Sequence, residues 1–235
     1  MEKKETDTEN KELIFFKHLS SFALKLEKAS DEHEIFQDIA DKIKERYPAS
    51  YIIISVITPQ DNSYNIHILK GIGKLRQAIE TLIGKDIFSI KFPLSQISTD
   101  NLRLNSNGQL NKIDGGIYTL ALESIPKSIA GSIEKMLGIN QVYTMGLALD
   151  SCNFGNLTIF CKKECVFSTT DITFIETLSV ISSIALQKIR IHQRVHLERE
   201  KMDRILQVVP VGIGLLIDRI FQDVNDRVCE ITGYS

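Results

Sequence analysis

The spacing of apolar positions changes several times along the chain, and each change predicts a different element. Apolar residues three and four apart predict amphipathic helices, while short β-branched or alternating runs between turn residues predict strands. The first third is predicted to hold a helix from Asn10, a helix from its N-cap Ser30 to Pro48, strands at 51–57 and 64–70, and a helix at 74–83. The two strands are joined by the turn cluster 59–63, so they form a hairpin.

The rest of the chain has one irregular region and a second predicted hairpin. Residues 86–123 are broken by Pro, Asn and Gly, and we expect one short helix there at 100–104. The following elements are predicted to be a helix at 124–137, strands at 139–149 and 155–161, and a helix from Asp171 to Gln207. Ser168 or Thr170 is the expected cap of this last helix, and Gly146 is a possible bulge.

The second half of the long predicted helix has apolar residues at the spacing of one coiled-coil seam. These residues are Ile184, Ile191, Val195, Met202 and Ile205. Lys188 and Glu198 occupy the remaining core positions, so the seam is interrupted. We therefore expect a homodimer through residues 184–205 whose weak seam can shift its register.

Composition narrows the class of protein. The 235 residues are 43% hydrophobic and 25% charged, with a formal net charge of −2, which is ordinary for a soluble globular protein and argues against a nucleic-acid binder. No apolar run reaches the roughly 18–20 residues of a membrane span, and the charged N-terminus is not a signal peptide. We expect a cytoplasmic protein whose four cysteines are reduced thiols.

The strand pair near residue 150 and the helix after it carry a family resemblance. The stretch Met145-Gly-Leu-Ala-Leu-Asp-Ser-Cys-Asn-Phe-Gly-Asn-Leu-Thr-Ile-Phe-Cys161, followed by Phe167-Ser-Thr-Thr-Asp171, resembles the end of a GAF domain. The resemblance covers residues 12–190, after a polar tail at 1–11. It implies an α/β (α+β) fold, with a central antiparallel sheet flanked by helices and Gly155 in a tight hairpin turn.

The C-terminal residues carry a second resemblance. Val209-Pro-Val-Gly-Ile213, Val224-Asn-Asp226 and Ile231-Thr-Gly-Tyr-Ser235 resemble the start of a PAS sensory domain, and 208–235 is much shorter than a whole one. A GAF domain, a signalling helix at 184–207 and a PAS start are together similar to the sensory region of prokaryotic sensor histidine kinases. That likeness implies a two-component system with a kinase or response-regulator partner, and no catalysis by this chain itself.

Two short motifs invite catalytic interpretations that their surroundings do not support. Gly71-Ile-Gly73 lies between a strand and a helix, but Arg76 stands where a dinucleotide-binding loop needs a small residue. His196 lies on the long helix, as a phospho-accepting His would, but no Pro follows until Pro210. We interpret the first motif as a turn and the second as a solvated helix position.

Histidine and cysteine residues suggest two alternatives. Haem is held in some GAF domains by His or Cys, and His67 or Cys152 are the possible ligands here. Some GAF relatives are thiol-dependent reductases, which Cys152 with Cys161 would imitate. Cys161 and Cys165 form only one loose pair, which does not indicate a zinc site, and a purely structural dimer scaffold is a third alternative.

The irregular region 86–118 is the expected ligand lid, because long loops over a sheet commonly serve as lids. The residues expected to line a small-molecule pocket are Phe88, Phe92, Ile97, Leu104, Tyr118 and Tyr143. We expect a bound ligand to shift the lid, repack the first and last helices of the domain, and move the seam at 184–205. The sequence does not identify the ligand.

Overall fold

The computed structural model describes residues 2–58, 61–97, 107–121, 125–150 and 152–234, with side chains from Phe15 onward. The chain divides into two compact units, Met1–Gln187 and Lys188–Ser235. The short helix predicted at 100–104 and the pocket residue Leu104 lie outside the described residues.

The larger unit is built on one antiparallel sheet in the strand order β3-β2-β1-β6-β5-β4. The strands are β1 Ser50–Thr58, β2 Ser63–Lys70, β3 Lys91–Pro93, β4 Asn111–Lys112, β5 Ile139–Leu149 and β6 Cys152–Lys162. β1 pairs with β6 from Ser50 opposite Cys161 to Val56 opposite Gly155, which joins the two predicted hairpins in a single sheet. The segment predicted to be irregular adds the short strands β3 and β4 at its edges.

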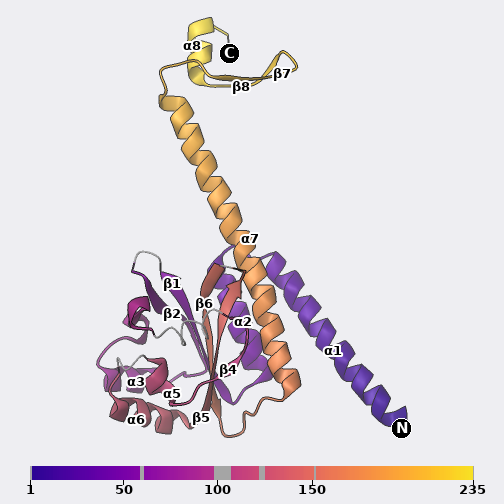
Figure 1. Cartoon of the computed structure of the whole chain (residues 1–235), viewed down its shortest axis with the longest axis vertical. Coiled ribbons are helices and arrows are strands. Elements are labelled where there is room, and N and C mark those ends of the chain that lie inside the picture. The colour runs from indigo at the N-terminus through magenta and orange to yellow at the C-terminus, as the bar shows by residue number, and fades with distance from the viewer. Residues whose placement is uncertain (1, 59–60, 98–106, 122–124, 151, 235) are drawn as a thin grey trace. The chain divides into compact units, whose positions relative to one another are not determined.

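Helices cover both faces of this sheet (Figure 1). On one face lie α1 Glu2–Glu27, α2 Glu32–Arg46 and the first part of α7 Thr169–Val208. On the other lie α3 Leu75–Ile83, α5 Gly116–Leu120, α6 Lys127–Leu137, and the 3₁₀ turns η1 Ile87–Ser89 and η2 Leu94–Gln96. The α/β fold with an antiparallel sheet flanked by helices is as predicted.

The central strand β6 explains why both faces need cover. Asn156, Thr158 and Phe160 point to the α3–α6 face, so Leu157 and Ile159 between them point to the α7 face. All five are buried. A strand buried on both sides has a nearly continuous apolar sequence, so the few polar residues within it stand out.

Hydrogen bonds at the helix ends define where α2 and α7 begin. Asp31, not Ser30, caps α2 by accepting from the Glu34 N–H at 2.8 Å. Ser168 caps α7 as predicted: its hydroxyl accepts from the Asp171 N–H, and the Asp171 carboxylate accepts from the Ser168 N–H at 3.1 Å. α1 begins at Glu2, earlier than the helix predicted from Asn10, and α6 begins at Lys127 rather than 124.

The Asp171 carboxylate also ties α7 to the end of α2. It accepts from the Tyr47 hydroxyl at 2.7 Å and from the Arg46 guanidinium at 3.2 Å. Burial raises the pKa of Asp171, but the hydrogen bonds from Ser168, Tyr47 and Arg46 outweigh it and hold this pKa below its usual value. The carboxylate is therefore ionised at neutral pH.

Gly155 has a different role from the one expected. It lies inside β6, while the β5–β6 turn contains Asp150, which has a positive φ of 53°. The Cα of Gly155 faces β1, and a Cβ added there would lie 2.2 Å from the Ser55 carbonyl oxygen. Only glycine therefore fits at this position between the two paired strands. The register irregularities of β5 lie at 139–141 and 147–148 rather than at Gly146.

The smaller unit contains the end of α7, the hairpin of β7 Gly214–Ile217 and β8 Ile220–Val224, and α8 Asp226–Thr232. Asn225 is buried and joins these elements. Its amide nitrogen donates to the carbonyls of Leu206 and Val211 at 3.0 Å, and its oxygen accepts from the N–H groups of Ile213 and Val228.

Among the described helices, α7 alone is long and apolar enough to cross a membrane, and 44% of its apolar window is buried in the protein. Its Phe174, Ile175 and Leu178 are almost completely buried in the larger unit. That burial is typical of the core helix of a domain. The sequence-based expectation of no membrane span stays a prediction.

Candidate functional site

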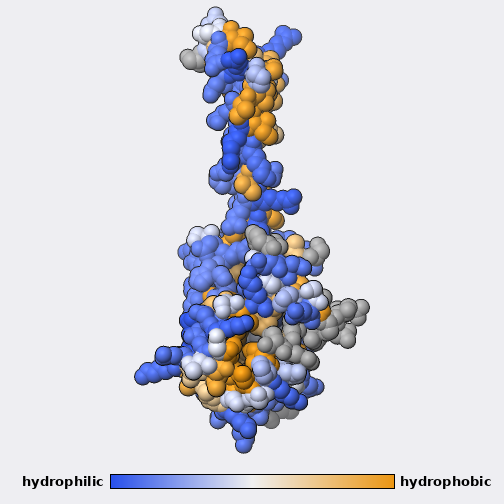
Figure 2. All heavy atoms as spheres, turned by 90° about the vertical axis from the view of Figure 1, so that its left-hand side faces the viewer, coloured by the Kyte–Doolittle hydropathy of each residue, from blue (hydrophilic) through white to orange (hydrophobic). Residues whose placement is uncertain are grey.

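A cavity of about 140 Å³ lies between the sheet and the helices α3, α5 and α6. Strands β1, β2 and β6 form its floor, and the segment from Ile87 to Ile97 closes one side. On the same face of the domain, apolar side chains gather at the surface low on the larger unit (Figure 2). Leu82 on α3, Phe88 on η1 and Met136 on α6 are among the large apolar residues that are exposed.

The lining is almost entirely aliphatic. The apolar lining residues are Ile53, Ile66, Leu69, Ile72, Ile79, Ile83, Ile87, Ile90, Phe92, Ile97, Ile117, Leu120, Ala121, Ile125, Ile133, Leu137, Ile139 and Phe160. The polar ones are Ser55, Tyr64, Asn156 and Thr158. Among the described lining residues none carries a charge, and none is His, Cys or Met.

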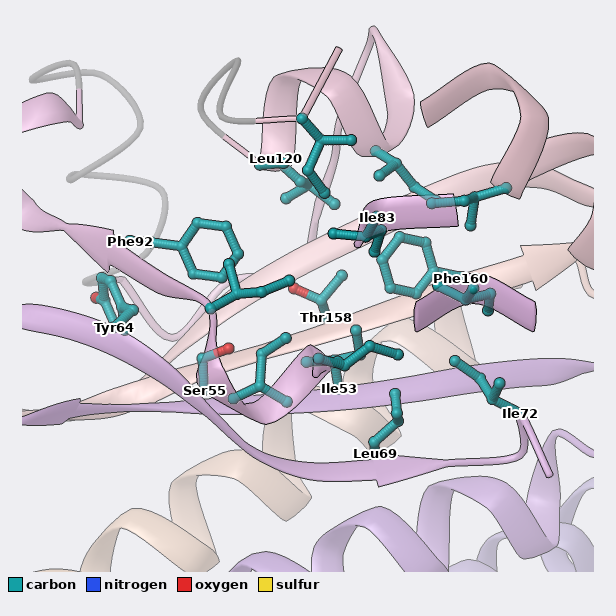
Figure 3. Close-up of a pocket in the computed structure, with 18 of the residues that line it drawn as sticks. Ile53, Ser55, Tyr64, Leu69, Ile72, Ile83, Phe92, Leu120, Thr158 and Phe160 are labelled. Atoms are coloured by element: carbon teal, nitrogen blue, oxygen red, sulfur yellow. The ribbon is translucent and has the colours of Figure 1, made fainter. Parts of the chain in front are cut away.

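Three of the polar residues come from the two central strands and lie close together. Ser55 on β1 is the register partner of Asn156 on β6, and Thr158 is two residues further along β6. The Thr158 hydroxyl lies 3.4 Å from the Thr144 hydroxyl, and the Asn156 amide donates to Thr144 at 3.4 Å. The Ser55 and Thr158 oxygens point into the cavity (Figure 3).

Tyr64 closes the polar end from β2. Its hydroxyl accepts a hydrogen bond from the Asn153 amide at 3.0 Å. Burial raises the pKa of Tyr64, and the Asn153 amide opposes this only in part. Tyr64 is therefore a neutral phenol at physiological pH.

The structure brings two of the predicted pocket residues, Phe92 and Ile97, into the cavity lining. Phe88 does not line it: the side chain is 38% exposed, and the Arg76 guanidinium lies 4.8 Å from its ring centroid. Tyr118 packs beside the cavity wall without lining it, 5.9 Å from the Lys127 ammonium. Neither of these two residues is among those that line the cavity.

Tyr143 was also assigned to the wrong face of the sheet. It lies on β5 next to Val142, which packs in the core on the cavity side, so strand alternation turns Tyr143 toward the α7 face. There its ring lies 4.9 Å from the Phe167 ring, and its hydroxyl donates to Gln141 at 2.7 Å.

His67 does not meet the requirement for a haem ligand. A register shift lets β2 pair both Ile66 and Ile68 with consecutive residues of β1, so Ile66 faces the cavity and His67 does not. The His67 imidazole lies 2.9 Å from that of His33 on α2. Burial and the neighbouring His33 lower the pKa of His67, which keeps its ring neutral near pH 7.

Cys152 does not meet the requirement for a haem ligand either, because it is exposed at the start of β6 and lines no part of the described cavity. Cys161 lies near the other end of this strand, roughly 30 Å away at about 3.3 Å per residue, so the two cannot act together in a reductase. Cys161 instead lies 2.9 Å from Cys165, sulfur to sulfur. That hydrogen bond and burial raise the pKa of Cys161, which is a neutral buried thiol.

Haem and metal chemistry therefore find no matching donors in the described part of the chain. No group of three or more His, Cys, Asp or Glu residues is placed to hold a metal ion within the ranges that the structure describes. A haem would need an axial ligand from the cavity wall. Tyr64, the one lining residue with a ligating side chain, already accepts from Asn153.

Sequence reasoning missed the polar residues of the cavity. Ser55 interrupts the apolar run of β1, and Asn156 and Thr158 interrupt that of β6. A polar residue inside a strand whose two faces are both buried is uncommon. This interruption is the signal that would have pointed to the three residues.

The larger unit is thus an α/β domain with an antiparallel sheet that has an apolar cavity on one face. Solved structures with the same architecture identify it as a GAF-type fold. The chain superposes on the chromophore-binding domain of an unusual bacteriophytochrome, RpBphP3, from R. palustris with a TM-score of 0.55 and 13% identity, over 76% of this chain and 62% of that one. It also superposes on the GAF domain of an Acinetobacter phosphoenolpyruvate-protein phosphotransferase, with a TM-score of 0.52 and 12% identity, over 77% and 96%.

These likenesses show the fold alone, since the identities are low. The longer RpBphP3 bacteriophytochrome matches with a TM-score of 0.57 and 12% identity, over 82% of this chain and 42% of that one. The chain thus spans less than two thirds of the bacteriophytochrome chains that it matches. No protein-family model and no curated protein matches the sequence.

Proposed function

We propose that the chain is the sensory part of a cytoplasmic signalling protein, in which a small molecule enters the cavity and α7 passes the bound state onward. The observation that carries this proposal is the position of the cavity. It lies on one face of β5 and β6, and α7 packs on the other face of the same strands. Successive residues of these strands face the cavity and α7 in turn, so a ligand that moves the strands also acts on α7.

Two described contacts support such a path. The Ser179 hydroxyl on α7 donates to the Gly146 carbonyl of β5 at 3.4 Å. The Glu176 carboxylate on α7 accepts from the Leu110 N–H at 2.9 Å, just before β4. Glu176 thus ties part of the expected lid, at Leu110, directly to the signalling helix.

The exposed stripe on α7 supports a homodimer through 184–205. Ile184, Ile191, Val195, Met202 and Ile205 are between 53% and 63% exposed, and they occupy the seam positions of one heptad register. A second copy of the same helix is the occupant that matches this spacing. Because Lys188 and Glu198 weaken the seam, two registers lie close in free energy, and a small shift at the sheet can select one.

The smaller unit supports a GAF–PAS arrangement of the kind found in sensor histidine kinases. It contains the two strands and capped helix of the proposed PAS start, tied together by Asn225. Leu215, Leu216 and Phe221 on its hairpin are more than half exposed. Exposed apolar residues of this kind are normally covered by further sheet or by a partner. We assign kinase or response-regulator activity to partners or further domains rather than to these residues.

A crosslinking experiment with a cavity-filling variant tests this function. Ala121 lines the cavity, and Ala121→Phe places a phenyl ring in it, whereas Ala78→Phe makes the same change at an exposed position of α3. Single cysteines at 191, 195 and 202 are introduced into a chain in which Cys152 and Cys229 are serine. Bismaleimide crosslinking then reports the pairing of the two α7 helices.

We expect crosslinked dimers in the unmodified chain and a changed order of crosslinking efficiency in Ala121→Phe, with Ala78→Phe unchanged. Identical patterns in all three proteins would refute the coupling of cavity and helix. Absence of crosslinks at every position would refute the dimer. Ile133→Phe fills the same cavity from α6 and replaces Ala121→Phe if that variant does not fold.

A further inference from the structure

The size of the cavity limits its occupant. An apolar cavity of about 150 Å³ in another protein holds one benzene ring, and the cavity here is about 140 Å³. A haem or another large planar chromophore has a much larger volume than this cavity. The volume instead suits a single ring or a chain of comparable bulk, roughly six to nine non-hydrogen atoms.

The absence of charge in the described lining limits the occupant further. A carboxylate or ammonium transferred from water into an apolar site without a partner is strongly disfavoured. The polar groups of the lining are the hydroxyls of Ser55 and Thr158, the amide of Asn156 and the neutral phenol of Tyr64. Anionic ligands such as phosphates and carboxylic acids therefore have no counter-charge among the described residues.

Ser55 supplies the reason to expect a hydrogen-bonding group on the ligand. Its hydroxyl faces the cavity, and no described residue hydrogen-bonds to it. Among the described residues, the nearby Thr158 hydroxyl has a contact of 3.4 Å to Thr144, which is long for an O–H···O hydrogen bond. The Ser55 hydroxyl is open to the cavity rather than paired within the described protein, so a ligand group that hydrogen-bonds to it gains affinity and a fixed orientation.

We propose that the ligand is a neutral lipophile of single-ring size that carries one hydrogen-bonding group, such as a phenol, a small aromatic amide or a short-chain alcohol. Ile53, Phe92 and Phe160 hold its apolar body, and the Ser55 hydroxyl binds its polar group, with Thr158 beside it. This inference rests on the proposed function, since it names the ligand class of the sensing cavity.

Two pairs of probes of matched shape test the proposal by titration calorimetry on the full chain. Toluene and phenol differ by a methyl against a hydroxyl, and benzamide and benzoate differ in charge. Ser55→Ala removes the cavity hydroxyl, while Ser182→Ala removes a buried hydroxyl on α7 that does not line the cavity. Thr158→Val is the second cavity variant, and it preserves side-chain shape.

We expect benzamide to bind at least about tenfold more tightly than benzoate. We expect Ser55→Ala to lower the ratio of phenol to toluene affinity about two- to tenfold, with Ser182→Ala unchanged. Equal binding of benzoate, or an unchanged ratio in both Ser55→Ala and Thr158→Val, would overturn the ligand class. So would no binding of any probe at millimolar concentration. None of these results decides the sensor function, which the crosslinking of Ala121→Phe tests separately.

Discussion

Gly155→Ala is the substitution that most directly probes the packing of the sheet beneath the cavity. Gly155 lies in β6 opposite Val56 of the paired strand β1, and its neighbour Asn156 pairs with Ser55. The new Cβ would lie 2.2 Å from the Ser55 carbonyl oxygen and 3.2 Å from the Val56 Cα. Ordinary van der Waals contact begins at about 3.4 Å, so the strands would have to separate by more than an ångström.

The clash involves backbone atoms of two paired strands, so no side-chain rotation can relieve it. Overpacking of a core typically costs about 1–3 kcal/mol and sometimes more. We expect the free energy of unfolding of the larger unit to fall by at least about 3 kcal/mol. At about 2–4 °C per kcal/mol for a chain of this size, its Tm should fall by roughly 6–12 °C. Urea unfolding followed by far-UV circular dichroism measures the first quantity, and a thermal melt measures the second.

Gly131→Ala is the matched control. Gly131 lies in α6, and a Cβ added there meets no atom within 4 Å. Alanine is favoured over glycine in a helix by about 0.5–1 kcal/mol, so this variant should be more stable than the parent chain. A loss of less than about 1 kcal/mol in the free energy of unfolding of Gly155→Ala would refute the close approach of β6 and β1 at this position. A similar loss in Gly131→Ala would show that any added methyl group is harmful.

Three further predictions concern the contacts of α7 and β2. Asp171→Asn should lower the free energy of unfolding at pH 7 by about 1–3 kcal/mol, because an amide accepts weaker hydrogen bonds than a carboxylate. Urea titrations should show this difference shrinking as pH falls below 3.8, because a carboxylate with a lowered pKa contributes its stability only above that range. The pKa of His67 is lowered from 6.5 by burial and by His33, so the unfolded chain binds more protons below pH 6.5. Stability should therefore fall on acidification from pH 7 to 5, and a slope as steep in His67→Gln would exclude this histidine as the source. Glu176→Gln keeps the hydrogen bond to the Leu110 N–H but removes its charge; amide hydrogen exchange at Leu110 should accelerate about threefold or more, and unchanged exchange would show that the contact does not hold this segment.

Most of the fold could be predicted from the sequence because its elements carry local signals. The β-branched run from Tyr51 and the alternating run from Tyr64 specify strands, and the Ser168–Asp171 cap specifies the start of α7. The role of Gly155 could not be predicted in this way. A glycine in a turn and a glycine between two closely paired strands have the same local sequence features. Only the pairing of β1 with β6 distinguishes them.

The site was predicted less well, since facing directions depend on register. Tyr143 was assigned to the cavity because it is aromatic and near the second hairpin, but alternation in β5 places it on the α7 side. His67 was judged from the residues on either side of it, and the register shift of β2 changes which of them share a face. Ser55 and Thr158 were not chosen because polar residues in a strand are usually assigned to the solvent side.

The cavity is the physical basis of the proposed sensing, because the side chains around it lack packing partners on one side and a ligand that fills it supplies them. A ligand at one hundred times its Kd stabilises the domain that binds it by about 2.7 kcal/mol. This total binding energy does not by itself move the α7 seam, since a ligand shifts the register only by the difference between its affinities for the two registers. If the two registers lie close in free energy, as the proposal requires, an affinity ratio of about tenfold, or about 1.4 kcal/mol, is enough to change which of them is populated.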